Sequence, residues 1–351
     1  MNSIRKSVTT ESDAYSNYNN YNYYGNYQTG NYYNDTMTYY QYPYNTQTMQ
    51  YPQDQYPYYY YYYEDKALTG INYLDAYILG GGLKRGEVYL IAGEAGTGKT
   101  IFSLTFLRTG ADLGEVGMYV TVDEPSEDVK KGVRDALGWD LDSYERGGKL
   151  IVADFRTYFR IYARDEKITL DPRDLAKMII EQVKKYDVKR LVIDPIAPLI
   201  IMSHQDVIWI REYLRELVFQ LKRMKDVTTI MTSEIPTGEE NKLSRFGVEE
   251  YLASGVIMLS LREISMANSD FGCLARIMFI RKMRWMPIRP IKLIYEIGPG
   301  GIYVIGPLND ENTLNYYKGY YCGQQYSQGY YYYPQQQYYT SQYYETQQYP
   351  Q

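Results

Sequence analysis

Residues 93–100, Gly-Glu-Ala-Gly-Thr-Gly-Lys-Thr, constrain the fold of this chain more than any other segment. They fit the pattern G-x-x-x-x-G-K-[ST] at every position, and they lie between an apolar run and a helical pattern. Such a loop curls so that successive N–H groups point at phosphate, and the helix that follows adds its positive dipole end. We therefore expect a nucleotide phosphate site formed by Gly93, Glu94, Ala95, Gly96, Thr97, Gly98, Lys99 and Thr100.

Tyrosine is concentrated at the two ends of the chain. Of the 46 tyrosines, 20 lie in residues 1–65 and 14 in residues 312–351. Both ends are also rich in Asn, Gln, Gly, Ser and Thr and nearly devoid of aliphatic side chains, so they cannot offset the entropy of ordering. We expect a Tyr/Asn/Gln-rich disordered tail over 1–65, one folded domain over 66–311 and a Tyr/Gln-rich disordered tail over 312–351.

Between the tails, apolar runs alternate with helical patterns. Strands are expected over residues 87–92, 116–122, 150–155, 191–194 and 228–233, with helices over 99–111, 125–137, 171–186 and 205–224. The last of these helices has an apolar stripe, so we expect it to lie on a sheet. From residue 256 strands follow one another, over 256–261, 276–283, 291–296 and 302–305. This order indicates an α/β fold: a mainly parallel sheet covered by helices, with an antiparallel C-terminal extension.

Charge and cysteine content exclude some functional classes. The net charge of −5 divides into −4 for residues 1–65 and −1 for the core, which gives no general argument for nucleic acid and leaves only a local basic groove open. Cys273, Cys322 and the single His204 suggest neither a disulfide framework nor a zinc site. Apolar runs such as residues 196–202 are too short to span a bilayer, so we expect a cytoplasmic protein without a membrane span.

Carboxylates at strand ends are the candidates for catalysis. Asp194 ends an apolar run, where it would hold Mg²⁺ together with the Thr100 hydroxyl. Asp123 and Glu124 end another strand, and Glu124, the longer of the two, is our choice for the base that activates water. The alternative for Asp123 is helix capping before residue 125, and for Asp194 capping of a turn.

Thr232, Ser233 and Glu234 end the fifth expected strand. Ser233 and Glu234 would lie at the same carboxyl edge of the sheet as the phosphate loop. That position suits contact with the γ-phosphate. We therefore include both residues among the nucleotide-binding candidates.

Taken together, these residues resemble the KaiC-like branch of the RecA-type ATPases. The resemblance covers about residues 67–305 and includes, besides the phosphate loop, Thr69-Gly-Ile, Leu74-Asp75, the stretch from Gly80 to Gly86, Thr121-Val-Asp-Glu, the stretch from Leu137 to Leu141, Val192-Ile-Asp, Thr232-Ser-Glu, the stretch from Gly247 to Val256 and Lys282-Met-Arg. It implies a RecA-like fold, ATP with Mg²⁺ as cofactors, and a homo-oligomeric ring, of hexamer type, with nucleotide between subunits. It also implies that Lys282 and Arg284 reach the neighbour's phosphates.

Three positions depart from the family's usual pattern. Asp123 replaces the first of two glutamates, Ser254 replaces an aspartate, and Trp285 replaces a glycine beside Arg284. Tyr251 lies where autokinase members have adjacent Ser and Thr, so the chain resembles the ATPase type, with Tyr251 as a conceivable phosphate acceptor.

The sequence therefore predicts a Mg²⁺-dependent, ring-forming regulatory ATPase with adhesive Tyr-rich tails and a protein client that the residues do not identify. Two alternatives remain. One is a recombination accessory ATPase that binds single-stranded DNA through stacked tyrosines. The other is a nucleotide-sensing scaffold with little turnover, favoured by the departures at Asp123 and Trp285.

Overall fold

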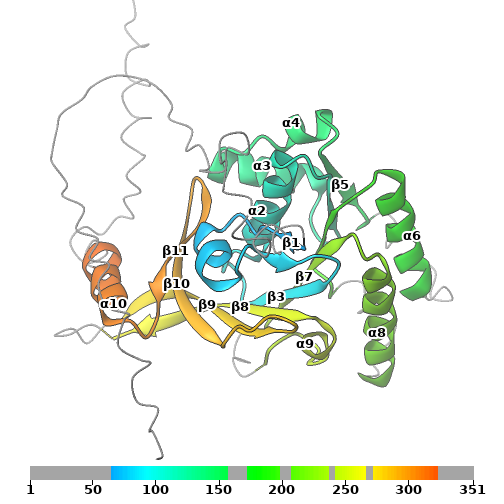
Figure 1. The fold of residues 1–351 in the computed structure, drawn as a ribbon. Helices are drawn as coiled ribbons and strands as arrows, with labels where there is room; N and C mark the ends of the chain where they lie inside the picture. The colour runs from blue at the N-terminus through cyan, green and yellow to red at the C-terminus, as the bar shows by residue number, and fades with distance from the viewer. Residues whose placement is uncertain (1–64, 157–171, 198–206, 237–241, 266–271, 323–351) are drawn as a thin grey trace, which may run out of the picture. The chain divides into compact units, whose positions relative to one another are not determined.

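The computed structural model describes residues 65–156, 172–197, 207–236, 242–265 and 272–322. The expectations for most of the two tails and for His204 fall outside these residues. Within them, nine strands form one sheet in the order β11-β10-β9-β8-β3-β7-β6-β4-β5 (Figure 1). From β8 to β4 in this order, neighbouring strands include pairs from distant parts of the sequence, as crossover connections require, whereas β8 to β11 follow one another along the chain.

The parallel part of the sheet has β3 near its centre. Strands β3, β4, β5, β6, β7 and β8 pair in parallel, with the bounds Val88–Gly93, Gly117–Thr121, Leu150–Asp154, Arg190–Asp194, Thr228–Glu234 and Gly255–Ile264. All six residues of β3 and all five of β6 are buried, as expected for parallel strands that are covered on both faces. The predicted α/β fold is confirmed.

The antiparallel extension follows β8. Strands β9, β10 and β11 have the bounds Cys273–Met283, Ile291–Gly298 and Gly301–Pro307, and each pairs antiparallel with the strand before it. The tight connection between β10 and β11 falls at Gly298 and Gly301, where Gly301 has φ +111° and thus a backbone conformation that favours glycine. The predicted antiparallel extension is confirmed.

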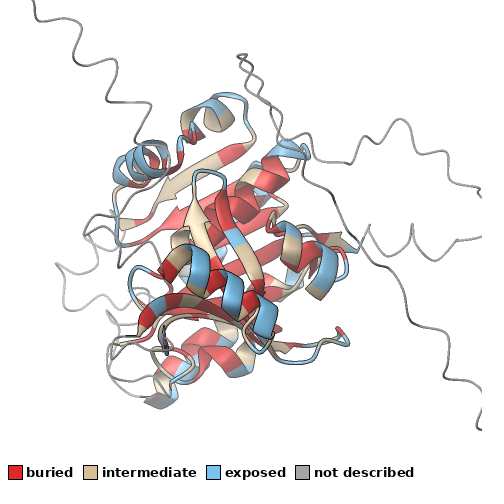
Figure 2. Ribbon diagram, turned by 90° about the vertical axis from the view of Figure 1, so that its left-hand side faces the viewer, coloured by how far each residue is buried: buried red, intermediate tan, exposed pale blue. Residues whose placement is uncertain are grey.

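Two apolar cores lie on opposite faces of the sheet. Alternate residues of β3 belong to each: Val88 and Leu90 pack in one core, and Tyr89 and Ile91 in the other. Helices α6 (Pro172–Lys185) and α8 (Val207–Arg223) cover the first face, whereas α2 (Lys99–Asp112), α3 (Ser126–Leu137) and α4 (Leu141–Arg146) lie toward the second. Figure 2 shows the outward helix faces exposed, strands in the middle of the sheet buried and other strands of intermediate burial.

The apolar stripe of α8 confirms the expectation that this helix lies on the sheet. Ile210, Leu214, Leu217 and Leu221 are all buried in the first core. The outward side of the same helix exposes Ile208 and Phe219. No helix among the described residues is long and apolar enough to cross a membrane.

A third, smaller core joins the chain's last described segment to the antiparallel strands. Helix α10 (Glu311–Tyr317) and the helical turn η2 (Lys318–Cys322) pack on β9 and β10, so described structure continues beyond the expected boundary at residue 311. Cys273 and Cys322 form a disulfide with a Cα–Cα distance of 5.7 Å, so the expectation of no disulfide was wrong. The two cysteines lie 49 residues apart and meet only because α10 folds back on β9.

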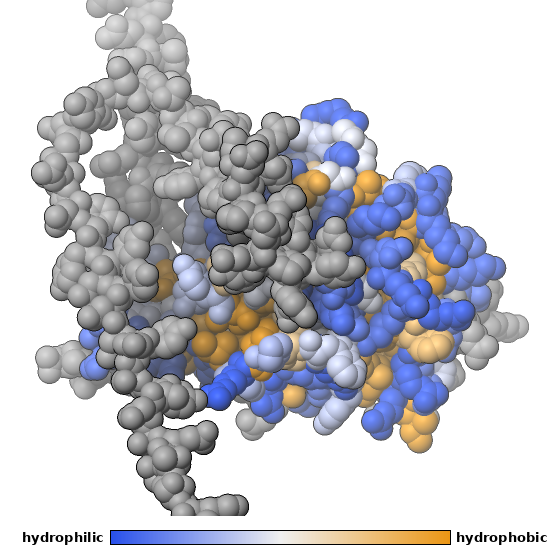
Figure 3. All heavy atoms as spheres, viewed as in Figure 1, coloured by the Kyte–Doolittle hydropathy of each residue, from blue (hydrophilic) through white to orange (hydrophobic). Residues whose placement is uncertain are grey.

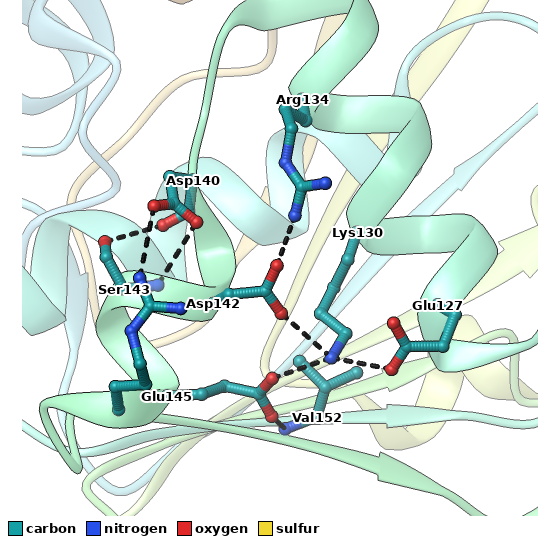
Figure 4. A network of polar contacts seen from close by, with 9 residues as sticks. Glu127, Lys130, Arg134, Asp140, Asp142, Ser143, Glu145 and Val152 are labelled. Carbon is teal, nitrogen blue, oxygen red and sulfur yellow. Dashed lines mark hydrogen bonds and ion pairs between the residues drawn. The ribbon is translucent and has the colours of Figure 1, made fainter.

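A charged network connects α3, α4 and β5 (Figure 4). The Lys130 ammonium lies 2.8 Å from Glu127, 3.1 Å from Asp142 and 2.9 Å from Glu145. Glu145 also accepts a hydrogen bond from the backbone N–H of Val152, at 3.1 Å. These hydrogen bonds, with that to Glu127 the largest contribution, raise the pKa of Lys130, so the cation is held by acidic groups of its own chain.

The segment before β3 forms a small cap. Strands β1 (Lys66–Ala67) and β2 (Leu83–Lys84) pair antiparallel, and the helical turn η1 (Leu74–Ile78) lies between them in sequence. Thr69 donates to the Asp75 carboxylate through both its N–H and its hydroxyl, each at 2.9 Å. Burial nevertheless raises the pKa of Asp75 to about 6. Thr69 and Asp75, two of the residues that carry the family resemblance, therefore have a structural role in this segment.

Candidate functional site

The phosphate loop lies between the carboxyl end of β3 and the start of α2. Gly96 and Gly98 have φ +76° and +93°, which L side chains rarely adopt. A Cβ atom at Gly93 would lie 2.2 Å from the backbone oxygen of Leu259 on β8. The loop is thus closely packed at its start and left-handed at two later positions, as a phosphate cradle requires.

Lys99 turns its side chain back over this loop. Its ammonium donates to the backbone oxygens of Gly93 and Glu94, at 3.0 and 2.9 Å. Burial lowers the pKa of Lys99, while the negative charges of Glu234, Asp194 and Glu94 act in the opposite direction. The cation therefore has backbone oxygens as its hydrogen-bond partners, and it lies among acidic groups without a direct ion pair to them.

Asp194, at the end of β6, collects hydroxyl donors from three elements. Its carboxylate accepts from Thr100 at 2.8 Å, from the Tyr119 phenol at 2.6 Å and from the Thr232 hydroxyl. The structure thus brings the predicted Mg²⁺ pair, Thr100 and Asp194, into direct contact. Tyr119 was not foreseen, although β4 pairs Thr121 with Asp194 and so places Tyr119 on the same face of the sheet. Thr232 was expected at this edge of the sheet, but as a contact of the γ-phosphate and not as a donor to Asp194.

Asp123 and Glu124 follow the carboxyl end of β4, and both are exposed. Partial burial is the main cause that raises the pKa of Asp123, and the negative charges of Glu234 and Asp194 add to it. The Thr121 hydroxyl donates to the backbone oxygen of Glu124 at 2.6 Å, which fixes the chain where it leaves the strand. Both carboxylates are accessible at the same sheet edge as the phosphate loop.

Ser233 and Glu234 end β7 but face different surroundings. The Ser233 side chain is fully buried and donates to Glu249 of the short helix α9 (Glu249–Leu252), at 3.1 Å. Glu234 is half-exposed, lies 3.6 Å from Arg245 and contributes to the electrostatic surroundings of Lys99 and Asp123. Of this pair, the structure brings Glu234 toward the phosphate loop and directs Ser233 into a buried network.

Lys282 and Arg284 lie far from their own chain's phosphate loop. Lys282 donates to the backbone oxygens of Glu250 and Ala253, both at 2.7 Å, and Arg284 donates to that of Tyr251 at 2.9 Å. Desolvation, with the charge of Arg284 adding to it, lowers the pKa of Lys282 to about 8.

The register of the sheet gives the separation between these cations and the loop. The backbone N–H of Arg284 donates to the backbone oxygen of Ser254. The backbone N–H of Ser254 in turn donates to the backbone oxygen of Val88, the first residue of β3. Val88 lies five residues before Gly93, which is about 17 Å along a strand. That is farther than an arginine side chain extends.

The departures from the family pattern also have defined surroundings. Trp285 has φ +64° and is 76% exposed, and Tyr251 is 63% exposed. Ser254 is buried and donates to Glu87, and it accepts from Lys222 at 2.6 Å. The hydroxyl at this position thus joins a Lys222–Glu87 ion pair, which lies at 3.1 Å, instead of supplying a charge.

Two residues outside the predicted set complete the loop. The phenol of Tyr295, on β10, donates to the backbone oxygen of Thr97. Arg262, on β8, lies 3.1 Å from the Glu94 carboxylate. No local motif marks either residue. Each reaches the loop because strand pairing brings β8 and β10 beside it, and the sequence alone does not reveal that pairing.

These residues fit a nucleoside triphosphate with Mg²⁺. The left-handed glycines, the Lys99 ammonium and the Thr100–Asp194 hydroxyl–carboxylate pair are the donor set that triphosphate and a hard cation need. No group of three or more His, Cys, Asp or Glu in the described part of the chain could hold a metal by itself. A Mg²⁺ ion at a phosphate loop needs no such group, since phosphate oxygens and water supply most of its ligands.

Comparison with known proteins agrees with this geometry. A family model described as the KaiC ATPase matches residues 67–309. A UPF0273 protein of Thermotoga maritima is 34% identical over 244 residues, which cover 67% of this chain and 94% of that protein. The circadian clock protein KaiC3 of Synechocystis is 37% identical over 199 residues, 56% of this chain but 37% of KaiC3.

A solved structure shares the fold. The crystal structure of a KaiC-like protein from the archaeon Pyrococcus horikoshii is 36% identical, with a TM-score of 0.56, and the match covers 68% of this chain and 98% of that one. The predicted RecA-like fold is confirmed by this likeness and by the nine-stranded sheet. The chain belongs to the KaiC family of RecA-like ATPases.

Proposed function

We propose that this protein is a Mg²⁺-dependent, ring-forming ATPase of the cytoplasm whose nucleotide state regulates contact with a protein client. The observation that carries the proposal is the hydrogen bond from Thr100 to Asp194, together with the partly buried Lys99 ammonium on which the Asp194 charge acts. That arrangement places a cation, a hydroxyl and a carboxylate at the one edge of the sheet where ligands of α/β folds bind.

Each residue of the site has a distinct task in this proposal. The loop N–H groups and Lys99 hold the β- and γ-phosphates, and Thr100 with Asp194 holds Mg²⁺, which when bound neutralises charge on the phosphate oxygens. Tyr119 and Thr232 orient the Asp194 carboxylate through their hydroxyls. The negative charge of Glu234 acts on Lys99, so Glu234 can respond to the charge of a phosphate bound beside that lysine.

Water activation falls to Glu124 or Asp123. Glu124 occupies the position of the second glutamate of the resembled pair and is exposed toward solvent. Asp123 has the raised pKa that suits a general base. We propose Glu124 as the base and Asp123 as the group that modulates its charge.

Lys282 and Arg284 act between subunits in this proposal. They lie beside the beginning of β3, whereas the phosphate loop follows its end, so neither can reach the nucleotide of its own chain. A head-to-tail ring would place them against the neighbour's γ-phosphate, where a planar guanidinium can bind two oxygens.

The test separates binding, hydrolysis and trans action. Glu124→Gln is expected to keep ATP affinity and lose hydrolysis, and Asp123→Asn is the matched variant. Subunits with Lys99→Ala mixed with subunits with Arg284→Ala should regain part of the ATPase activity that each lacks alone, because some interfaces pair an intact loop with an intact arginine. Parental turnover in Glu124→Gln, or no recovery despite demonstrated subunit exchange, would contradict the assignments.

A nucleotide-sensing scaffold with little turnover is the second candidate. Lys282 and Arg284 already donate to backbone oxygens of the α9 segment, so they must leave these partners before they contact a neighbour. Trp285 has a left-handed backbone conformation, which favours glycine, directly beside Arg284. Slow turnover in the parent that increases in the Trp285→Gly variant would therefore favour this candidate.

A further inference from the structure

An open groove lies on the antiparallel part of the sheet, at the opposite end of β10 from the phosphate loop. It has a volume of about 780 Å³ and is lined by η1, the connection between β9 and β10, and the chain after β11. Its lining is largely apolar, including Ile78, Phe279 and Leu308. Figure 3 shows apolar residues gathered on this side of the molecule with hydrophilic residues around them.

The neighbouring helix explains why this groove is open. On β9, Cys273, Ala275 and Ile277 pack under α10 and η2 in the third core. Phe279 follows at the same two-residue spacing and so lies on the same face. Phe279, however, is not covered by α10 or η2 but lines the groove, where it is only partly buried. One face of the extension is therefore covered over one half and open over the other.

The groove combines aromatic rings with cations. Lys292 and Arg281 lie 5.4 and 5.7 Å from the Phe279 ring centre. Tyr77, at the other wall, is 77% exposed. Arg289 and Lys292 are exposed lining residues, and among the residues that the structure describes neither has a carboxylate partner. None of the described residues that line the groove is acidic.

A segment of the same chain has the complementary chemistry. Residues 54–65 read Asp-Gln-Tyr-Pro-Tyr-Tyr-Tyr-Tyr-Tyr-Tyr-Glu-Asp, with seven tyrosines, three acidic groups and no cation. Tyrosine rings bind cations and other rings, and the acidic flanks match Arg289 and Lys292.

The position of residue 66 brings this segment within reach. The Lys66 ammonium donates to the backbone oxygen of Leu79 at 3.2 Å, so the chain enters the described structure beside η1, which forms one wall of the groove. Eight extended residues span up to about 26 Å, which exceeds the width of such a groove.

We propose that the tyrosine tract of residues 56–63 binds in this groove of its own chain, with its rings on Phe279 and Tyr77 and its acidic flank against Arg289 and Lys292. Binding there holds one tyrosine tract on the folded domain, so the tract is not available for contact with other chains. The inference is independent of ATP turnover, because the groove and the phosphate loop share no residue.

The test is hydrogen exchange of residues 286–292 in the full chain. In the first variant, serine replaces each tyrosine from Tyr58 to Tyr63. The matched control has the same six-fold replacement in the other tail, at Tyr330, Tyr331, Tyr332, Tyr333, Tyr338 and Tyr339. The first variant should exchange about tenfold faster than the parent, the effect of losing one desolvated ring–cation contact, and the control should match the parent.

A charge exchange sharpens the assignment. Arg289→Glu should speed exchange of the groove segment, and Arg289→Glu combined with Glu64→Arg should restore the parental rate. Equal exchange in the parent and the first variant would overturn the proposal. Protection that disappears on dilution would assign the groove to a second copy instead, and protection that arises only with single-stranded DNA would assign it to nucleic acid; both results would also overturn it.

Discussion

Lys99 and Lys130 lie on consecutive helices but in opposite surroundings. The Lys130 ammonium has three carboxylates of its own chain within 3.1 Å, and its pKa is raised (Figure 4). The Lys99 ammonium has two backbone oxygens at 2.9 and 3.0 Å, and burial lowers its pKa. One positive charge is paired with carboxylates by the fold, whereas the other is held by backbone oxygens at the phosphate loop.

This difference separates a structural cation from a functional one. Charge-assisted hydrogen bonds to carboxylates connect α3 to α4 and so stabilise the folded state. A partly desolvated cation whose partners in the described structure are backbone oxygens costs stability and retains its capacity to bind an anion. The two lysines should therefore respond to substitution in opposite assays.

Lys99→Ala should have the largest effect on nucleotide binding. We expect ATP affinity to fall about 100-fold, because a charged, partly desolvated hydrogen-bond donor to the phosphates is lost. Thermal stability without nucleotide should be unchanged or higher. Titration calorimetry and thermal unfolding measure the two quantities, and parental ATP affinity in this variant would remove Lys99 from the site.

Lys130→Met should instead reduce the free energy of unfolding, by about 2 kcal/mol, because three carboxylates lose their shared cation. ATP affinity should remain parental. Lys131→Met, on the next residue of the same helix and exposed, is the matched control and should change neither quantity. An ATP defect in Lys130→Met without a stability change would invalidate the comparison between the two lysines.

The sequence patterns were most informative where local chemistry decides the outcome. Continuous apolar runs indicated the parallel strands, because burial on both faces selects such runs. The phosphate loop was predictable from its glycines, and Asp194 from its place at the end of a strand. The Thr100–Asp194 contact follows from these two features.

Residues that depend on register or long-range packing were not predictable. Ser233 was a nucleotide-binding candidate, but Thr232 and Ser233 alternate on β7, and it is Thr232 that donates to Asp194. The Cys273–Cys322 disulfide depends on the docking of α10, which no spacing encodes. Lys130 also looks in the sequence like any helical surface cation, since two of its three carboxylate partners, Asp142 and Glu145, come from another helix.

The pH dependence of stability should sharpen the contrast. The raised pKa of Lys130 means that its contribution is complete below about 10.4, the unfolded value, and is lost as pH rises beyond it. The hydrogen bond to Lys130 lowers the pKa of Asp142, so that contribution is present above about 3.9 and lost as pH falls through its folded value. The network is therefore strongest between these limits.

The contribution of the Lys99 charge to the free energy of unfolding should have the opposite sign. Because its pKa is lowered, its charge costs stability at neutral pH, and this cost fades as pH rises toward the unfolded value. Urea unfolding of the parent, Lys130→Met and Lys99→Ala across pH measures both effects. The parent's advantage over Lys130→Met should shrink toward acid and alkali, and a constant difference at every pH would contradict the ion-pair account.

Tyr119→Phe should have the smallest effect, because it changes the surroundings of the site without removing a charge. The phenol is one of three hydroxyl donors to Asp194, and the ring itself is buried in the core that α2 covers. Loss of one hydrogen bond is worth about 1 kcal/mol, so the Mg²⁺ concentration for half-maximal turnover should rise about fivefold. Tyr89→Phe is the control, since its ring lies in the same core and its phenol donates to the backbone oxygen of Lys84, away from the site. Unchanged Mg²⁺ dependence would mean that Thr100 and Thr232 orient Asp194 without Tyr119, whereas a loss of 100-fold or more would place the phenol itself in the chemistry.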